Sequence, residues 1–272
     1  MRADLHTHSN FSFDADPAAT LCAMCDAAIE KGLSHLAITD HSDLDAPADR
    51  FSHWFDPEAR FAAFERVKAE YAGRLTLLFG IELGEVNHYP DTAAAVLARY
   101  PYDIVLSSLH NLAGERDFYH FDFASLTERE IAALFDRVLT ETEALCDVPG
   151  THVITHLTYL HRYLRRDGRD LDFSPFTDRL QALFRKMIAR GLALEVNTST
   201  LSTAGGMTMP TAELISLYRD CGGTLISLGS DAHTPAGIAK EFDRAEQMLR
   251  ACGFSELAVP TAGGVLHFPL KF

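Results

Sequence analysis

Histidine and carboxylate residues recur at short spacings along this chain of 272 residues. His6 and His8 are separated by one residue, and Asp231 and His233 repeat that spacing far along the chain. Side chains two positions apart on an extended segment point to the same side, so His6 and His8 can bind one ion, and Asp231 and His233 can share the opposite wall of its site. Imidazole and carboxylate ligands without a thiolate suit zinc, manganese or iron. A single pair of this kind is a weak signal, because histidine–carboxylate pairs also occur as plain structural contacts.

Short apolar runs alternate with amphipathic helical patterns, and these predict the elements that position the polar residues. The apolar runs cover residues 2–5, 34–39, 75–81, 103–109, 151–155, 192–196 and 224–229. The helical patterns cover residues 17–31, 57–72, 91–99, 126–146, 174–190, 210–221 and 237–250. Nearly continuous apolar strands separated by helices indicate a parallel sheet covered by helices, either open or closed into a barrel.

Every predicted strand delivers an imidazole, a carboxylate or a carboxamide at its carboxyl end. In chain order these residues are His6 and His8, Asp40 and His41, Glu82, His110, His156, Glu195 and Asn197, and Asp231 and His233. An open sheet would spread them along a line, whereas a barrel collects the carboxyl ends of its strands at one mouth. We therefore predict a barrel with a site for two or three divalent ions of zinc, manganese or iron, bridged by Glu82.

Three further acidic residues are placed outside the ligand set. Asp40 is interpreted as a residue that orients a ligand or caps a helix. Glu85 follows Glu82 in a loop and is interpreted as solvated, and Glu195 is expected to face the barrel interior beside Asn197. The remaining histidines are assigned to the surface or to packing, and they are His35, His53, His88, His120, His152, His161 and His267.

Composition excludes several other classes of protein. A net charge of −14 argues against a surface that binds nucleic-acid polymers or acidic membranes. No apolar stretch approaches the roughly 18 residues that a membrane helix needs, and no signal peptide is evident, so we expect a cytoplasmic protein. The five scattered cysteines indicate reduced thiols. Cys22 and Cys25 are expected to pack in the core, on a helix that starts at Asp16-Pro17.

Six motifs resemble a known family. DLHTHSNFS, AITDH, GIELGE, LSSLH, THLTYLHRY and SLGSDAH follow one another between residues 4 and 233. They resemble the polymerase-and-histidinol-phosphatase (PHP) phosphoesterases, and among these the stand-alone histidinol-phosphate phosphatases. The resemblance implies an α/β fold, a distorted (β/α)7 barrel that forms a single domain over residues 1–272. It also implies hydrolysis of a phosphate monoester, above all L-histidinol phosphate in histidine biosynthesis.

The resemblance also implies three metal positions. The first takes His6, His8, Glu82 and Asp231; the second shares Glu82 and adds His110 and His156; the third takes His41, His233 and Asp14. Asp16 competes for the place of Asp14, but its position before a proline makes it a better helix cap. A water that bridges two ions would attack phosphorus, and Asp231 or His233 would deliver a proton to the leaving alkoxide.

The expected phosphate contacts depart from the family pattern. Related phosphatases often carry a glycine, and then an arginine, after the Asn-Thr-Ser of the sixth strand, whereas this chain continues Thr200-Leu201-Ser202. We expect Arg162 to hold the phosphate, with Arg165 or Arg116 as alternatives. Asn197 and Ser199 are the other expected substrate contacts. Two alternatives stay open, namely a phosphoesterase for a nucleotide or another small ester, and a metal-stabilised domain without activity.

Overall fold

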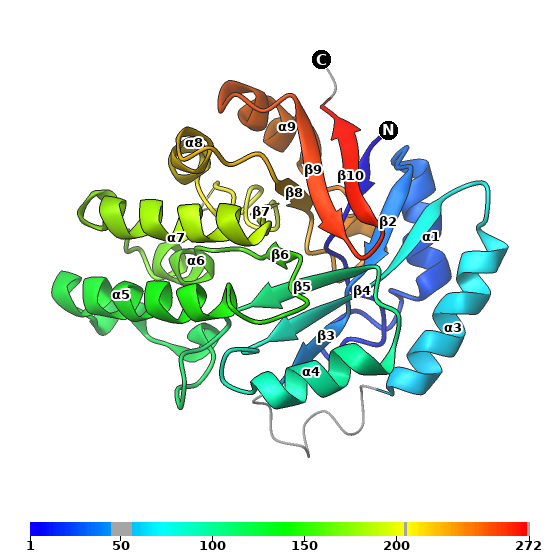
Figure 1. Cartoon of the computed structure of the whole chain (residues 1–272), viewed down its shortest axis with the longest axis horizontal. Helices are drawn as coiled ribbons and strands as arrows, with labels where there is room; N and C mark the ends of the chain where they lie inside the picture. The colour runs from blue at the N-terminus through cyan, green and yellow to red at the C-terminus, as the bar shows by residue number, and fades with distance from the viewer. Residues whose placement is uncertain (45–55, 204–205, 271–272) are drawn as a thin grey trace.

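The computed structural model describes residues 1–44, 56–203 and 206–270, and these form one mixed α/β structure around a single sheet (Figure 1). The order of the strands is β1-β2-β4-β5-β6-β7-β8-β9-β10, and β3 pairs with β4. Their bounds are β1 Ala3–Asp4, β2 His35–Ile38, β3 His41–Asp43, β4 Thr76–Gly84, β5 Ile104–Ser108, β6 Val153–Ile154, β7 Ala193–Asn197, β8 Ile226–Gly229, β9 Glu256–Thr261 and β10 Gly264–Pro269.

Seven of the described strands close into a barrel. Neighbours from β1 to β8 pair in parallel. The circle closes between β1 and β8, because the backbone N–H of Leu5 donates to the carbonyl of Leu228 at 3.2 Å. Thr7 forms a parallel bridge with Ala232 just beyond. The predicted barrel is therefore confirmed, and its first and last strands bring residues more than 200 positions apart into contact.

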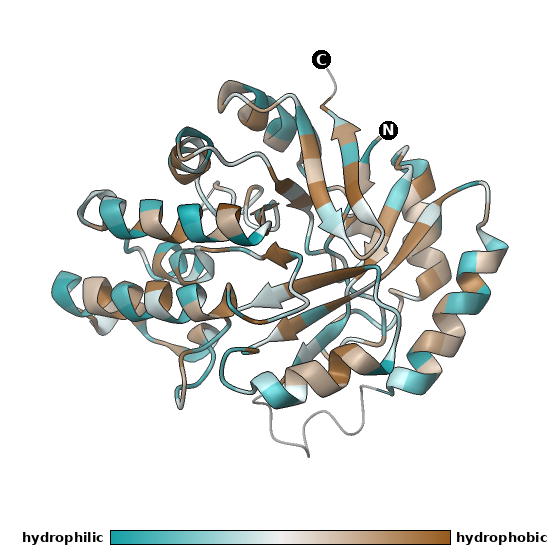
Figure 2. Cartoon of the chain, viewed as in Figure 1, coloured by the Kyte–Doolittle hydropathy of each residue, from teal (hydrophilic) through white to brown (hydrophobic). Residues whose placement is uncertain are grey.

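Helices surround the barrel on the outside (Figure 1). The α-helices are α1 Leu21–Glu30, α3 Pro57–Glu70, α4 Pro90–Arg99, α5 Glu128–Leu145, α6 Tyr159–Arg166, α7 Thr177–Arg190, α8 Ala212–Asp220 and α9 Phe242–Ala251. Short 3-10 turns occupy η1 Phe118–His120, η2 Phe123–Ser125, η3 Ser174–Phe176 and η4 Pro235–Gly237. Figure 2 shows apolar strands inside helices whose residues alternate between hydrophobic and hydrophilic, as expected when each helix buries one face. Among the described residues, no helix combines the length and apolarity needed to span a membrane.

The β9–β10 hairpin covers the amino ends of the barrel strands. Ala258 of β9 pairs with Ile226 at the start of β8. Between the two strands of the hairpin, Ala262 donates its N–H to the carbonyl of Asp103, just before β5, at 2.9 Å. At the other end, Phe268 packs edge-on against His35 of β2. The hairpin, which the sequence analysis did not predict, therefore lies opposite the predicted mouth.

The start of the first helix differs from the prediction. Helix α1 begins at Leu21 and is capped by Thr20, whose side chain accepts the N–H of Ala23 at 3.2 Å. Asp16 instead closes a turn, because its carboxylate accepts the N–H of Ala18 at 2.8 Å. Its own N–H donates to the carbonyl of His233 at 2.9 Å, so this turn is tied to the mouth of the barrel. The prediction that Asp16 caps the first helix was therefore wrong.

The close cysteine pair lies on α1, as predicted. Cys25 is fully buried in the core, and Cys22 lies half-buried at its edge. Both thiols are free. His53, assigned to the surface or to packing, lies outside the described residues.

Candidate metal centre

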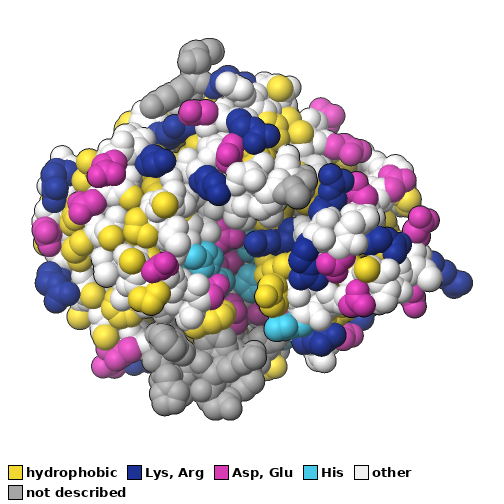
Figure 3. Space-filling view, turned by 180° about the vertical axis from the view of Figure 1, so that it is seen from behind, with side chains coloured by type: hydrophobic (Ala, Val, Ile, Leu, Met, Phe, Trp, Pro, Cys, Tyr) yellow, Lys and Arg dark blue, Asp and Glu magenta, His cyan; other side chains and the backbone are white. Residues whose placement is uncertain are grey.

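The predicted strand-end residues meet around a cavity of about 980 Å³ at the carboxyl end of the barrel. Figure 3 looks into its mouth, where histidine, acidic and basic side chains gather in a hollow. Seven of the nine predicted metal ligands line its wall, and these are Asp14, His41, Glu82, His110, His156, Asp231 and His233. His6 and His8 lie deeper, at 1% and 0% exposure. Residues that are scattered along the chain thus share one site.

Glu82 lies at the centre of the cluster and is fully buried. Its two oxygens contact five imidazoles. Oε2 lies 3.0 Å from His6 Nε2, 3.4 Å from His8 Nε2 and 3.1 Å from His41 Nδ1. Oε1 lies 3.0 Å from His156 Nε2 and 3.3 Å from His110 Nε2. Burial alone would raise the pKa of Glu82, but the charges of His6 and His41 hold it well below its usual range. Glu82 directs one oxygen toward each group of histidines, so it could serve as a ligand shared by two ions.

Asp231 lies beside His8 in the cluster. Its Oδ1 lies 3.2 Å from His8 Nε2 and 3.7 Å from His6 Nε2. The backbone at Asp231 is left-handed, with φ of 55°, a conformation that aspartate tolerates better than most residues. Buried Asp4 supports this loop by accepting the N–H of Ser230 at 3.0 Å and its hydroxyl at 2.5 Å. Burial raises the pKa of Asp4 to about 6, against the hydrogen bonds that lower it.

The third group of predicted ligands lies nearer to solvent. Asp14 Oδ2 is 3.0 Å from His233 Nε2 and 3.7 Å from His41 Nε2, and its side chain is 39% exposed. Burial would raise the pKa of Asp14, but the nearby rings of His233 and His41 lower it to about 2. The ring of His8 stacks between those of His41 and His233, with centroids 4.3 and 4.1 Å away. The third position therefore directly adjoins the first.

Buried nitrogens in this cluster match the requirements of metal ligands. Within the described part of the chain, His8 Nε2, His41 Nδ1 and His233 Nε2 make no hydrogen bond. Each nevertheless lies 3.0–3.2 Å from a carboxylate oxygen. Two ligand atoms that bind one zinc ion tetrahedrally at about 2.1 Å lie roughly 3.4 Å apart, close to these separations. Burial together with His233 and His41 lowers the pKa of His8 to about 4, so His8 is neutral and has a lone pair to donate.

Several overlapping groups of three side chains have donor atoms close enough to hold an ion. They are His6, His8 and Asp231; His6, Glu82 and His156; His41, Glu82 and His110; His8, His41 and His233; and Asp43, Glu85 and His110. The carboxylates add negative charge that a buried site can hold only when cations balance it. The donor set therefore fits more than one divalent ion.

Glu195, which the sequence analysis left outside the ligand set, orients His6. Its Oε1 contacts His6 Nδ1 at 2.6 Å, and its Oε2 accepts the backbone N–H of His156 at 2.7 Å. With Nδ1 as the donor, Nε2 of His6 faces Glu82 as a free lone pair. Gly229 makes room for this pair, because a Cβ there would lie 2.4 Å from His6 Cβ and 2.6 Å from Glu195 Oε1. The alternating spacing of Glu195 and Asn197 was the sequence signal for this role.

Replacing Glu195 with glutamine is expected to lower the metal affinity by about 10- to 100-fold. Both contacts of Glu195 need an acceptor, whereas an amide accepts only through its oxygen, so one donor is left facing an NH2 group. Metal content after gel filtration, measured by elemental analysis, checks this. Glu246→Gln is the matched control, since Glu246 is also buried but pairs with Arg2 outside the cavity. Equal metal retention in the two variants would contradict the role of Glu195.

Glu85 is buried, and the prediction that it is solvated was wrong. Its carboxylate accepts the N–H of His110 at 2.6 Å. The chain turns at Glu85 with φ of 58°, which directs the side chain inward.

Asp43, which the sequence analysis did not single out, lies 3.5 Å from His110 Nδ1 and 3.7 Å from His41 Nδ1. Strand β3 places Asp43 there, and the His-x-Asp spacing from His41 was the signal for it.

The outer wall of the cavity carries the predicted phosphate-binding side chains. Arg162 of α6 lines it half-buried, with the guanidinium 5.3 Å from the ring centre of Tyr163. Arg116 and Ser199 also line it. Arg165, one turn along α6, is exposed and pairs with Asp170.

The described cavity wall does not include Asn197. This residue is fully buried behind Asp231, to which its Nδ2 donates at 3.3 Å. The structure thus places Asn197 against Asp231, and places Ser199 on the cavity wall.

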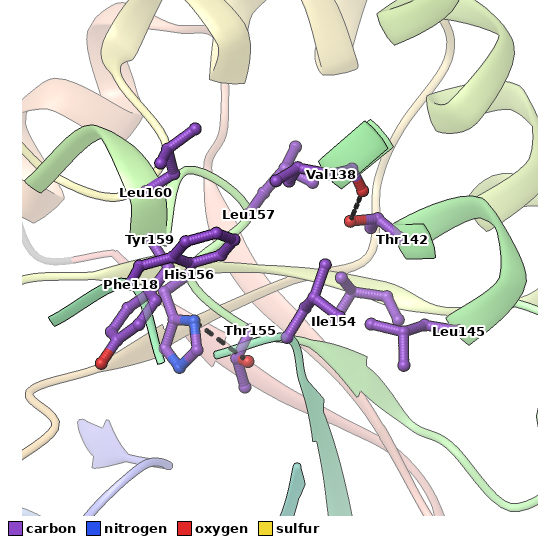
Figure 4. A pocket seen from close by; sticks show the side chains of 11 residues that line it. Phe118, Val138, Thr142, Leu145, Ile154, Thr155, His156, Leu157, Tyr159 and Leu160 are labelled. Carbon is purple, nitrogen blue, oxygen red and sulfur yellow. Dashed lines mark hydrogen bonds between the residues drawn. The ribbon is translucent and has the colours of Figure 1, made fainter. Parts of the chain in front are cut away.

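The far side of His156 is apolar. Figure 4 shows side chains from α5, β6, α6 and the segment between β6 and α6 packed around a small pocket beside this ring, including Ile154, Leu157 and Leu160. Thr155 Oγ1 lies 3.5 Å from His156 Nδ1, at the edge of this packing. With Nδ1 beside Thr155, the ring presents Nε2 toward Glu82, 3.0 Å from its Oε1.

The comparisons with known proteins agree with this geometry. The PHP domain family matches residues 4–199. The histidinol-phosphatase of Lactococcus lactis is 25% identical over 264 residues, which cover 94% of this chain and 93% of that protein. The probable histidinol-phosphatase of Thermotoga maritima is 25% identical over 256 residues, with 94% of each chain covered.

Solved structures of two proteins share the fold. The crystal structure of the Lactococcus lactis histidinol phosphate phosphatase, complexed with zinc, L-histidinol and phosphate, superposes with a TM-score of 0.83 at 23% identity, covering 97% of this chain and 98% of that one. The putative histidinol phosphatase of Listeria monocytogenes superposes with a TM-score of 0.74 at 18% identity, covering 89% and 99%.

Proposed function

This chain belongs to the PHP domain family, and from that premise we propose that it hydrolyses L-histidinol phosphate to L-histidinol and phosphate, a step of histidine biosynthesis. The observation that carries the proposal is the buried cluster around Glu82, whose two oxygens contact five imidazoles at the floor of an open cavity. Curated histidinol-phosphatases match the chain over nearly its whole length. The protein is a phosphoric monoester hydrolase that uses several divalent ions.

We propose that the metal ligands are the predicted nine residues: His6, His8, Asp14, His41, Glu82, His110, His156, Asp231 and His233. Bound divalent ions would supply a nucleophile from water near neutral pH and would neutralise phosphate oxygens. Glu195 and Asp43 hold His6 and His110 in orientation. A neutral His8 donates its lone pair without competition from a proton.

The cavity wall suggests how the ester is held and cleaved. The planar guanidinium of Arg162 suits two oxygens of one phosphate, and it would hold the ester in the cavity that it lines together with the cluster. Asp231 or His233, which both line the cavity, is proposed to take the proton released by the attacking water and pass it to the leaving alkoxide. We further propose that the enzyme works in the cytoplasm, as one domain, on a small ester and not on a nucleic-acid polymer.

Substrate profiling tests this function. Metal-loaded protein is assayed for phosphate release from L-histidinol phosphate, several nucleoside monophosphates and several sugar phosphates, and kcat/KM is compared. We expect L-histidinol phosphate to be the best substrate. Preference for another ester would overturn the assignment of the substrate and keep the reaction, and metal-loaded protein that hydrolyses none of them would overturn the reaction as well.

A further inference from the structure

Arg60 is a deeply buried arginine that the site described above does not use. It comes from α3 on the outside of the barrel, yet it is only 1% exposed. Its Nε donates to Asp40 Oδ2 at 2.6 Å, and its Nη2 donates to the carbonyls of Ile38 at 3.0 Å and Gly80 at 2.6 Å. Arginine is almost never fully buried unless it is paired. Here the partner is fully buried too, so the pair lies entirely inside the protein.

Asp40 connects Arg60 to the loop that follows β1 through hydrogen bonds. Its Oδ1 accepts the N–H of Ser9 at 2.6 Å and the hydroxyl of Ser12 at 3.2 Å. The hydroxyl oxygen of Ser12 has two more contacts, His8 Nδ1 at 3.1 Å and the backbone N–H of His41 at 3.1 Å. Ser12 thus stands between a buried ion pair and two of the proposed metal ligands.

The number of protons settles the direction of each bond. A hydroxyl has one proton, a carboxylate only accepts, and a backbone N–H only donates. The proton of Ser12 therefore goes to Asp40, and its oxygen accepts from His41 N–H. The same oxygen then accepts from His8 Nδ1–H. With its proton on Nδ1, His8 presents the lone pair of Nε2 toward Asp231 and Glu82, which is the form that binds a metal ion.

We propose that Arg60 is a positioning residue for the metal centre: it holds Asp40 as the acceptor for Ser12, and Ser12 in turn fixes the ring and tautomer of His8. The inference rests on the proposed role of His8 as a ligand. Arg60 is not among the described residues that line the cavity, so it has no access to phosphate. The charge of Asp40 is balanced inside the protein only while Arg60 is present, and removing one partner of such a pair leaves an uncompensated charge.

The first test is Arg60→Met, which keeps an unbranched apolar stem but removes the charge and the donors. Metal-free protein is titrated with zinc against a competing chelator. We expect the apparent affinity for zinc to fall by about 10- to 100-fold. The KM for the phosphate ester should stay unchanged, and excess zinc should restore most of the turnover.

Arg2→Met is the matched control. Arg2 pairs with buried Glu246 at 2.6 Å, and its side chain is 13% exposed. None of its described hydrogen-bond partners is a ring of the cluster. A general loss of stability would lower zinc binding in both variants, whereas a positioning role lowers it in the Arg60 variant alone. Equal losses in both would overturn the proposal.

A double-mutant cycle separates positioning from stability. Ser12→Ala removes the hydroxyl through which Arg60 would act, so Arg60→Met should cost little further zinc affinity in that background. Losses that add in the double variant would overturn the proposal.

If Arg60→Met does not fold, Arg60→Lys takes its place in the cycle. Lysine keeps a cation beside Asp40 but lacks the planar guanidinium that donates to two carbonyls. We expect Arg60→Lys to lose less zinc affinity than Arg60→Met, and to cause no further loss in the Ser12→Ala background. Unchanged zinc affinity in Arg60→Lys would count against the proposal.

Zinc affinity is measured without substrate. Protein that binds zinc as expected but does not hydrolyse L-histidinol phosphate would therefore contradict the proposed function and leave the role of Arg60 standing.

Discussion

Replacing Glu82 with glutamine is expected to lower kcat/KM for the phosphate ester by on the order of 10³-fold, because bridged ions contribute several kcal/mol to the transition state. The substitution keeps the shape of the side chain but removes the charge, and it turns one oxygen that faces imidazole lone pairs into an NH2 group. Zinc content should fall in parallel, since both groups of ligands share this carboxylate. Steady-state kinetics and elemental analysis of the same preparation check both expectations.

Glu141→Gln is a suitable control for this variant. Glu141 also contacts a histidine, His88, through its carboxylate, and its side chain is 18% exposed. It lies outside the described wall of the cavity. Kinetics close to the original protein are expected for this control. A Glu82 variant with full zinc content and full activity would refute the bridging role and, with it, the proposed arrangement of ions.

Replacing Arg162 with methionine is expected to lower kcat/KM by about 10²-fold while the zinc content stays unchanged. A guanidinium can donate two parallel hydrogen bonds to a phosphate, and these strengthen as charge develops on its oxygens. Methionine fills similar volume against Tyr163 and donates no hydrogen bond. Kinetics with metal content measured on the same sample separate this loss from a loss of metal.

The chain offers a matched control on the same helix. Arg165→Met removes a guanidinium one turn away that is exposed and paired with Asp170. We expect kinetics close to those of the original protein, because Arg165 is not among the described residues that line the cavity and an exposed ion pair contributes little to stability. Equal losses in both variants would mean that helix α6 is disturbed as a whole, and a larger loss in the Arg165 variant would move the phosphate contact to that arginine.

The parallel strands and most helices were readable from the sequence, because long apolar runs and helical periodicity are local signals. Strand β3, helix α6 and the β9–β10 hairpin were not. β3 is three residues of mostly polar character that pair beside β4. Helix α6 carries four charged or histidine side chains among its eight residues, so its apolar face is short. The outer strand of the hairpin is mostly exposed, which removes the alternation that identifies a half-buried strand.

The proposed ligands were identifiable because barrel strands end together, so a polar residue at each strand end predicts one shared site. The supporting residues could not be identified in the same way. The role of Glu195 depends on contacts with His6, 189 positions away, and with the backbone of His156. Glu85 was misread as solvated, since its burial follows from a left-handed turn that the sequence pattern does not announce.

The sequence by itself determined the chemistry of this protein: which side chains can bind metal, and the order in which the strands present them. Only the tertiary structure decided which nitrogen of each ring faces the carboxylates of the cluster. That choice depends on the second partner of each histidine, such as Glu195 for His6 or Ser12 for His8. These partners are brought into place by the closure of the barrel and by the burial of Arg60 against Asp40, and long-range packing of this kind leaves no local pattern in the sequence.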